Sequence, residues 1–448
     1  MPKVPSIAEE LNTLFPAQWI RRTARAHQVV QRVVKVDVVV FFWTVLLGPP
    51  AGAFVSLASL QRRFEAAAAI TLARSSFLDR FSKALVRFLE ACLDHAMEHS
   101  LSRWASPPVF ERFRDVLVQD STAVTVADTL ARFFPGVKTK AAVKVNAVSS
   151  VQTGSIRALA ISGGTRGETR FARITRRLEG HLLLLDLGYF SWSVFSKIDR
   201  VGAFYVSRLK GNANPRIVRD LHRGAGRRRP VVGLKLRDVL KKLKRQELDV
   251  EVEVSFTERR RPTKMNPRKT IRRTARLRVV GVRHPDTGTF HLYVTNLSPE
   301  ELDPEQVRAV YSARWFGELL FRELKSNCQL RRLPSRKPHV VRALILAAAI
   351  RLMVARVALE TIRCRYAADA RRRFPSGFDD FVEVLTRLRT TPERFHAVWR
   401  DLSPFFLLDV LRSAGVGWRP KHLDDLLAAA VIDPNRSRDS LWWRLSRA

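Results

Sequence analysis

Cysteine and acidic residues are both scarce in this sequence of 448 residues. The only cysteines are Cys92, Cys328 and Cys364, and their spacing matches neither a disulfide framework nor a zinc-binding pattern. This usage favours a reducing compartment. Asp and Glu together number 42 against 79 Lys and Arg, which gives a formal net charge of +37. A surplus of this size calls for a polyanionic partner, and nucleic acid is the leading candidate.

Long apolar segments are missing too. The strongest hydrophobic run, Val38 to Leu47, is too short to span a bilayer and is followed by Gly48-Pro49-Pro50, so it predicts a buried core segment. The first thirty residues lack the hydrophobic segment of a secretory signal, and we expect a cytoplasmic protein. An anionic membrane surface is the weaker alternative for the charge. Hydrophobic residues make up 46% of the chain, which predicts real cores and argues against a histone-like or ribosomal packing protein.

The periodicity of apolar residues divides the chain into five regions of a mixed α/β protein. Residues 1–108 have helical spacing and predict a helical DNA-binding domain, with a plain bundle bearing a basic face as the alternative. In residues 109–209, short apolar runs and apolar residues spaced by two predict the strands of the first part of the core. Residues 210–295 are very basic yet alternate, so they predict a β-rich insertion, with a disordered basic loop as the alternative. Residues 296–370 predict a second part of the core, and residues 371–448 a helical C-terminal region.

Two aspartates follow predicted strands directly. Asp120 comes after the apolar run from Val116 to Gln119, and Asp186 comes after the run from Leu182 to Leu185. Carboxylates at the ends of adjacent buried strands would lie close together, where both cannot stay ionised cheaply. Divalent cations remove that penalty, and oxygen ligands suit Mg²⁺ or Mn²⁺. Each aspartate alone is a weak signal, because many such residues belong to turns.

A third carboxylate lies in a helical pattern that runs from Pro304 to Lys325. On a single helix, one stripe about 60° wide would carry four polar residues, namely Tyr311, Arg314, Glu318 and Lys325. The opposite face, with Phe316, Leu320 and Leu324, would pack on a sheet. Carboxylates that hold metal beside cations that hold phosphate are the requirements of two-metal phosphodiester chemistry. The alternative is a solvated, salt-bridged helix face.

The spacing Tyr-x2-Arg-x3-Glu-x6-Lys at these four positions resembles the signature of DDE transposases from bacterial insertion sequences, in their insertion-sequence-four-like branch. Two further stretches are similar to that family: Gln119-Asp120-Ser121-Thr122 and Asp186-Leu187-Gly188-Tyr189-Phe190. The resemblance covers roughly residues 110 to 360. It implies an RNase H-like catalytic core, a mixed sheet flanked by helices and interrupted by a β-rich insertion.

The resemblance also implies a chemistry. Two Mg²⁺ or Mn²⁺ ions would be held by three catalytic residues: Asp120, Asp186 and Glu318. Phosphates near the element's end would be held by Tyr311, Arg314 and Lys325. The expected partners are double-stranded DNA, as terminal inverted repeats and as target, and a second copy of the chain on paired ends. The expected location is the nucleoid DNA of a bacterial cytoplasm.

The basic insertion adds candidate DNA-binding residues. Arg259, Arg260 and Arg261 form a run of three consecutive basic residues in the insertion, and we expect them to contact DNA. The remaining open question from the sequence is which activity the protein has. The leading function is cleavage at element ends followed by joining of the 3′-hydroxyl to target DNA. The alternatives are a catalytically inactive protein that binds element ends, and an RNase H-like nuclease that cuts without joining.

Overall fold

The computed structural model describes most of the chain up to residue 373, with short gaps. The described residues are 6–30, 36–48, 56–99, 108–167, 174–222, 230–259, 270–284, 286–326, 333, 335–373, 407, 410, 411 and 413–415. Arg260, Arg261 and most of the predicted region 371–448 therefore lie outside them. The chain forms two compact units, residues 1–94 with 339–448, and residues 95–338.

The first unit is helical. Its elements are α1 (Ile7–Leu14), α2 (Ala17–Ala26), α3 (Val38–Leu47), α4 (Leu57–Ala68), α5 (Arg74–Leu78), most of α6 (Lys83–His99) and α12 (Pro338–Arg373). All ten side chains of α3 are buried, which confirms the predicted core segment. Arg351 of α12 donates hydrogen bonds to the carbonyl oxygens of Val45 and Leu46, and so satisfies the C-terminal end of α3. Among the described residues, no helix combines the length and apolarity that a membrane crossing requires.

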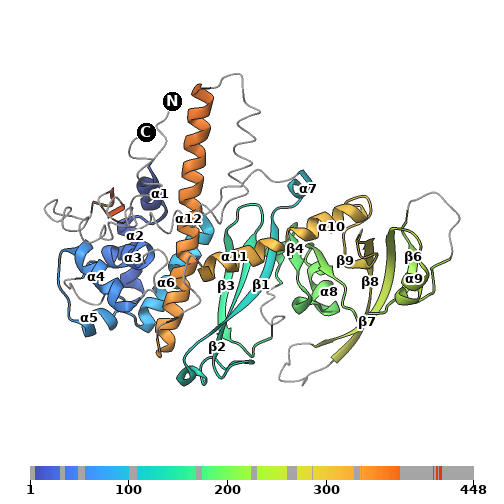
Figure 1. Cartoon of the computed structure of the whole chain (residues 1–448), viewed down its shortest axis with the longest axis horizontal. Helices are drawn as coiled ribbons and strands as arrows, with labels where there is room; N and C mark the ends of the chain where they lie inside the picture. Colours follow the sequence, from blue (N-terminus) through green and yellow to red (C-terminus); the bar gives the residue numbers. More distant parts are fainter. Residues whose placement is uncertain are drawn as a thin grey trace. The chain divides into compact units, whose positions relative to one another are not determined.

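The second unit is built on one nine-stranded sheet with the order β3-β2-β1-β4-β5-β9-β8-β7-β6 (Figure 1). The strands are β1 (Val116–Thr125), β2 (Ala142–Ser150), β3 (Ile156–Gly163), β4 (Leu182–Leu185), β5 (Phe204–Arg208), β6 (Arg216–Asp220), β7 (Glu247–Arg259), β8 (Thr270–Arg283) and β9 (Phe290–Thr295). The first three strands pair antiparallel, whereas β4 lies parallel to both β1 and β5. This mixed arrangement is the RNase H-like core that the sequence predicted, and the insertion extends its sheet from β9 to β6.

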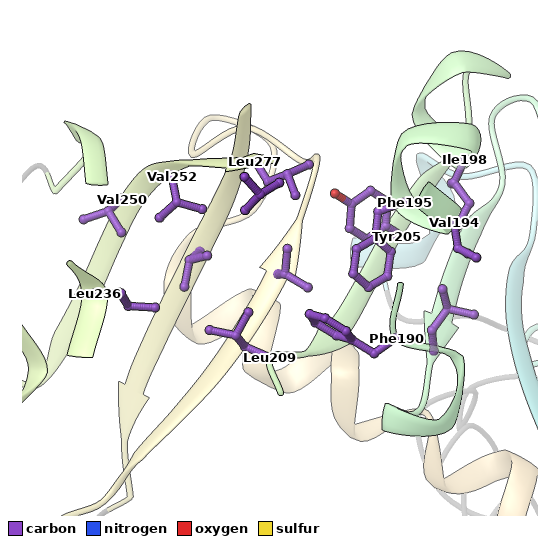
Figure 2. Packing of buried hydrophobic residues seen from close by; sticks show 14 of the residues in the cluster. Phe190, Val194, Phe195, Ile198, Tyr205, Leu209, Leu236, Val250, Val252 and Leu277 are labelled. Carbon is purple, nitrogen blue, oxygen red and sulfur yellow. The ribbon is translucent and has the colours of Figure 1, made fainter. Parts of the chain in front are cut away.

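Helices cover both faces of this sheet. One face carries α7 (Pro108–Glu111), α10 (Pro304–Ser312) and α11 (Trp315–Ser326), and the other carries α8 (Trp192–Arg200) and α9 (Leu236–Lys242). Successive side chains of β4 point to opposite faces of the sheet. Leu182 and Leu184 therefore join the buried cluster on one face, and Leu183 and Leu185 join the cluster on the other. Figure 2 shows the second cluster, which unites α8 with the insertion strands.

Two local predictions were wrong. The first strand does not end at Gln119, because its hairpin pairing with β2 continues as far as Thr125 opposite Ala142. The predicted helix from Pro304 to Lys325 is two helices, with Ala313 and Arg314 between them. There the backbone hydrogen bonds tighten to three-residue spacing, as in the bond from the Arg314 N–H to the Tyr311 carbonyl.

Candidate active site

Asp120 and Asp186 occupy equivalent positions on two neighbouring parallel strands. The parallel pairing of β1 with β4 ends where Gln119 lies beside Leu185, and each aspartate is the next residue along its strand. Asp120 alternates with Val118 on β1 and so lies on the sheet face that carries α10 and α11. Neighbouring strands lie about 4.8 Å apart, which brings the two carboxyl groups together at this edge.

A glycine allows α11 to approach this edge closely. A Cβ atom placed on Gly317 would lie 2.8 Å from Cγ1 of Val118, 3.1 Å from Cβ of Asp120 and 3.3 Å from its Oδ2. No larger residue fits there without moving the helix or the strand. Sequence reasoning missed this role, although a glycine inside a helical pattern costs about 1 kcal/mol relative to alanine and so signals a packing requirement.

The next residue, Glu318, carries the third carboxyl group toward the two aspartates. Its Oε1 accepts a hydrogen bond of 2.6 Å from Nη2 of Arg314, four residues earlier. The Arg314 guanidinium also lies 6.0 Å from the centre of the Tyr311 ring. The break between α10 and α11 therefore keeps three of the four predicted stripe residues together, although the single-helix geometry behind the prediction was wrong.

The electrostatic environment of Asp120 ties the three carboxyl groups into one site. Burial is the main cause that raises the pKa of Asp120, and the charges of Asp186 and Glu318 raise it further. A hydrogen bond of 2.7 Å from the Ser121 backbone N–H to Oδ1 and the charge of Arg314 act in the opposite direction. Asp120 is therefore a carboxyl group whose ionisation depends on nearby positive charge.

Tyr311 and Arg314 keep their protons under ordinary conditions. Burial, with the charge of Asp186 as a further cause, raises the pKa of Tyr311 to about 12 against the opposing charge of Arg314. Burial lowers the pKa of Arg314, but its hydrogen bond to Glu318 and the neighbouring negative charges outweigh burial, so this pKa is raised overall. The site thus offers a phenol O–H donor and a fixed cation beside the carboxyl groups.

Arg208 is a site residue that sequence reasoning missed. The parallel pairing of β4 with β5 ends where Leu185 lies beside Ser207, so Arg208 is level with Asp186 on the next strand. Its guanidinium lies 5.8 Å from the centre of the Tyr293 ring, and its charge lowers the pKa of Tyr311. An arginine that directly follows a short apolar strand is the available signal, and it becomes informative only once the strand order is known.

The remaining predicted residues are not gathered here by any described contact. Lys325 is two turns beyond Glu318 on α11, which is about 10 Å along the helix axis. Arg259 ends β7 in the insertion, and Arg260 and Arg261 lie outside the described residues. Phe316 does not pack on the sheet as predicted, since it is 37% exposed.

The donor set suits divalent cations in kind. Asp186 and Glu318 lie close enough for their charges to raise the pKa of Asp120, and the three carboxyl groups supply the oxygen ligands that Mg²⁺ and Mn²⁺ prefer. Within the part of the chain that the structure describes, no three His, Cys, Asp or Glu side chains are placed closely enough to hold a metal ion together. Oε1 of Glu318 accepts the hydrogen bond from Arg314, so a metal ion held by this carboxylate would share it with the guanidinium.

Comparison with known proteins adds a family to this geometry. The model of the family described as "Transposase DDE domain" matches residues 111–354, a range that contains every residue of the site. The transposase for insertion sequence element IS231F of Bacillus thuringiensis subsp. israelensis is 23% identical over 297 residues, which are 60% of this chain and 62% of that protein. The transposase for IS1151 of Clostridium perfringens is 23% identical over 239 residues, 48% of this chain and 50% of that protein.

The chain thus spans about half to three fifths of the length of these curated relatives. A solved piggyBac transposase synaptic complex with hairpin DNA aligns with a TM-score of 0.42 at 10% identity, covering 96% of this chain and 85% of that one. The assignment to a family follows from the sequence match and not from this structural likeness.

Proposed function

This chain belongs to the transposase DDE domain family, and we propose that it is a DNA transposase that cuts at element ends and joins the freed 3′-hydroxyl to target DNA. One observation carries the proposal. Asp120 and Asp186 lie level on adjacent parallel strands, and the close approach of α11 to Asp120 brings the charges of Glu318 and of its partner Arg314, just before the helix, to bear on Asp120. Carboxylates gathered beside a fixed cation match the needs of phosphodiester chemistry, in which metal ions and phosphate must be held together.

We propose that two Mg²⁺ or Mn²⁺ ions are held by Asp120, Asp186 and Glu318. When bound, such ions activate the attacking oxygen and stabilise the leaving one. Tyr311 is a protonated phenol at neutral pH, since its pKa is about 12, and so can donate a hydrogen bond to a phosphate oxygen. Arg314 would supply a permanent charge for the same group, and we propose that Lys325, two turns beyond Glu318 on α11, holds a neighbouring phosphate.

DNA is the proposed partner of the whole basic surface. The formal charge of +37 supports strong, salt-dependent binding to duplex DNA. We propose that Arg259, Arg260 and Arg261 contact the DNA outside the active site. Two copies of the chain on paired element ends, on the nucleoid of a bacterial cytoplasm, complete the proposal. The family match and the basic charge support it.

The decisive experiment separates cutting from joining and from binding. The substrate is a duplex made from the DNA that flanks the gene and carries its terminal inverted repeat, with a target plasmid and Mg²⁺. We expect Asp120→Asn, Asp186→Asn and Glu318→Gln each to lower cleavage by at least about a hundredfold while end binding persists. The control is Asp238→Asn on α9, which removes the same charge from an exposed position.

Each alternative gives its own result in this assay. A nuclease would cut the duplex without joining it to the plasmid. An inactive derivative would bind the end and do neither. Wild-type cleavage rates in the Glu318→Gln variant under saturating Mg²⁺ would show that the third ligand is assigned wrongly.

A further inference from the structure

The connection between β1 and β2, residues 126–141, is a firmly built projection and not a loose turn. We call it the β1–β2 loop. Its base is closed by hydrogen bonds from the Val126 N–H to the Ala141 carbonyl and from the Ala142 N–H to the Phe134 carbonyl. Leu130 and Phe134 turn inward and are each 1% exposed. The loop therefore has a small core of its own, which fixes how its outer side chains are presented.

A glycine closes the tip of the β1–β2 loop. A Cβ atom on Gly136 would lie 2.0 Å from the carbonyl oxygen of Thr139, so only glycine fits. The Gly136 N–H donates to the Lys140 carbonyl, and the Thr139 hydroxyl donates to the Ala141 carbonyl. These bonds hold the backbone of residues 136–141 in one conformation, so the exposed side chains among them have fixed starting positions.

The outer surface of the loop combines apolar and basic side chains. Phe133 is 46% exposed and Val137 is 76% exposed, so both present apolar surface to solvent. The Arg132 guanidinium lies over the Phe133 ring at 4.7 Å. Lys138 and Lys140 are exposed beside them. Asp128 is the only acidic residue between positions 126 and 141, so the loop has a clear positive surplus.

The loop extends from the end of β1 that lies beyond Asp120. Strand β1 continues from Asp120 to Thr125 before the loop begins, a distance of about 17 Å along the strand. Figure 1 shows β1 and β2 running on past the point where α11 crosses them. For a duplex whose axis follows β1, successive phosphates of one strand are about 3.4 Å apart along that axis, so the loop lies about five nucleotides from a phosphate held at Asp120.

We propose that the β1–β2 loop is a second DNA-binding surface, which holds the substrate DNA about five or more nucleotides from the scissile phosphate. Lys138, Lys140 and Arg132 would contact phosphates, and Phe133 would pack on a sugar or an unstacked base. The inference rests on the proposed function, because it places the scissile phosphate at Asp120. A protein partner fits less well, since protein interfaces are depleted in lysine at their centre.

Position-specific crosslinking tests the inference directly. A set of inverted-repeat duplexes, each with one photoreactive thymine at a different distance from the cut, is irradiated with the full-length protein in Ca²⁺ in place of Mg²⁺, so that a divalent cation is present while the end is bound. We expect crosslinked peptides from residues 126–141 only for thymines about five to eight nucleotides from the cut. Crosslinks to the loop at every position, or at none, would overturn the inference.

Matched charge variants test the energetics. Lys138→Ala with Lys140→Ala should lower the slope of log affinity against log salt by up to about 1.8, because two phosphate contacts are lost. The control is Arg176→Ala with Arg177→Ala, which removes the same charge from exposed positions. These two residues precede β4 and so lie at the end of that strand opposite to Asp186. The control should leave the slope unchanged for the same duplex. Equal slopes in the loop variant and the control would overturn the inference.

A neutral variant separates stacking from charge. Phe133→Ala should weaken binding to the same duplex by about tenfold with the salt slope unaltered. Because Phe133 is half exposed, its removal leaves Leu130 and Phe134 in place and the loop folded. Unchanged affinity would overturn the assignment of Phe133. If the wild-type protein fails to cut this duplex in Mg²⁺, both the proposed function and this inference are wrong. If the wild-type protein cuts normally and the loop variants bind DNA as the wild type does, only the inference is wrong.

Discussion

The close contact between α11 and β1 makes Gly317→Ala the most informative single substitution. The new methyl carbon would lie 2.8 Å from Cγ1 of Val118, about 0.6 Å short of ordinary contact. Overpacking of this kind costs about 1–3 kcal/mol. Replacing glycine by alanine within a helix returns about 1 kcal/mol. We therefore expect the free energy of unfolding to fall by only about 0–2 kcal/mol.

The effect on catalysis should be much larger than the effect on stability. If α11 moves outward by about 0.6 Å, Glu318 moves with it while Asp120 stays on its strand. Misplacement of a catalytic group by 1 Å costs roughly a hundredfold in rate, so we expect end cleavage to fall by about tenfold or more. Urea denaturation and single-turnover cleavage in saturating Mg²⁺ measure the two quantities.

A matched control isolates the contact. Gly211 lies in open space, with no heavy atom within 4 Å of an added Cβ, so Gly211→Ala should leave cleavage unchanged. Full activity and full stability in Gly317→Ala would refute the reasoning, because a 2.8 Å approach cannot be relieved at no cost. A large loss of stability with an unchanged rate per folded molecule would mean that α11 does not position Glu318.

Three further predictions address charge. Burial raises the pKa of Asp120, so the folded protein binds this proton more tightly than the unfolded chain does. Without metal, the free energy of unfolding should therefore fall as pH rises above 3.8, the value of an unperturbed aspartate. Urea denaturation between about pH 4 and pH 7 measures this fall, and the Asp120→Asn variant should show a smaller one. Arg314→Ala frees Glu318, so Mn²⁺ titration calorimetry should show binding retained while strand transfer falls by about tenfold or more. Alanine at residues 259–261 should lower the salt slope of duplex binding by up to about 2.7 and leave cleavage of bound ends intact; an unchanged slope would contradict a DNA contact there.

The two aspartates were accessible to sequence reasoning because the strands before them are nearly pure leucine or valine runs. A short run such as Leu182 to Leu185 must be buried on both faces, so the first polar residue after it marks the end of that strand. The same reasoning on the run before Asp120 predicted a shared site without knowledge of which strands are neighbours, although β1 continues beyond Asp120 as far as Thr125. The strand order then made Asp120 and Asp186 level to the residue.

The features that escaped the sequence depend on contacts between distant segments. The break before Trp315 is fixed by Tyr311, whose ring packs 5.2 Å from Tyr293, and by the docking of Gly317 on β1. Helical periodicity alone runs through positions 311 to 325 without interruption. Arg208 likewise gains meaning only because β5 lies next to β4, and a strand's neighbours are set by tertiary packing and not by its own residues.

The distribution of charge explains how a very basic protein can hold a carboxylate site. Elsewhere in the same unit, acidic side chains are closely matched by arginine: Asp249 meets Arg278 at 2.8 Å, and Glu258 meets both Arg200 and Arg273, at 2.7 and 2.6 Å. In the active site, three carboxyl groups share one described ion pair, between Arg314 and Glu318.

On the proposed function, this local excess of negative charge would oppose the approach of a phosphate, whereas the net charge of +37 of the whole chain would attract the rest of the DNA. We therefore expect DNA to bind at a distance from the carboxyl groups before the scissile phosphate enters. On the proposed function, entry of the phosphate would require positive charge beyond what Arg314 supplies, and divalent cations held by Asp120, Asp186 and Glu318 would provide it. DNA binding should consequently tolerate metal removal, while the contact of the scissile phosphate with Arg314 and Tyr311 should depend on metal.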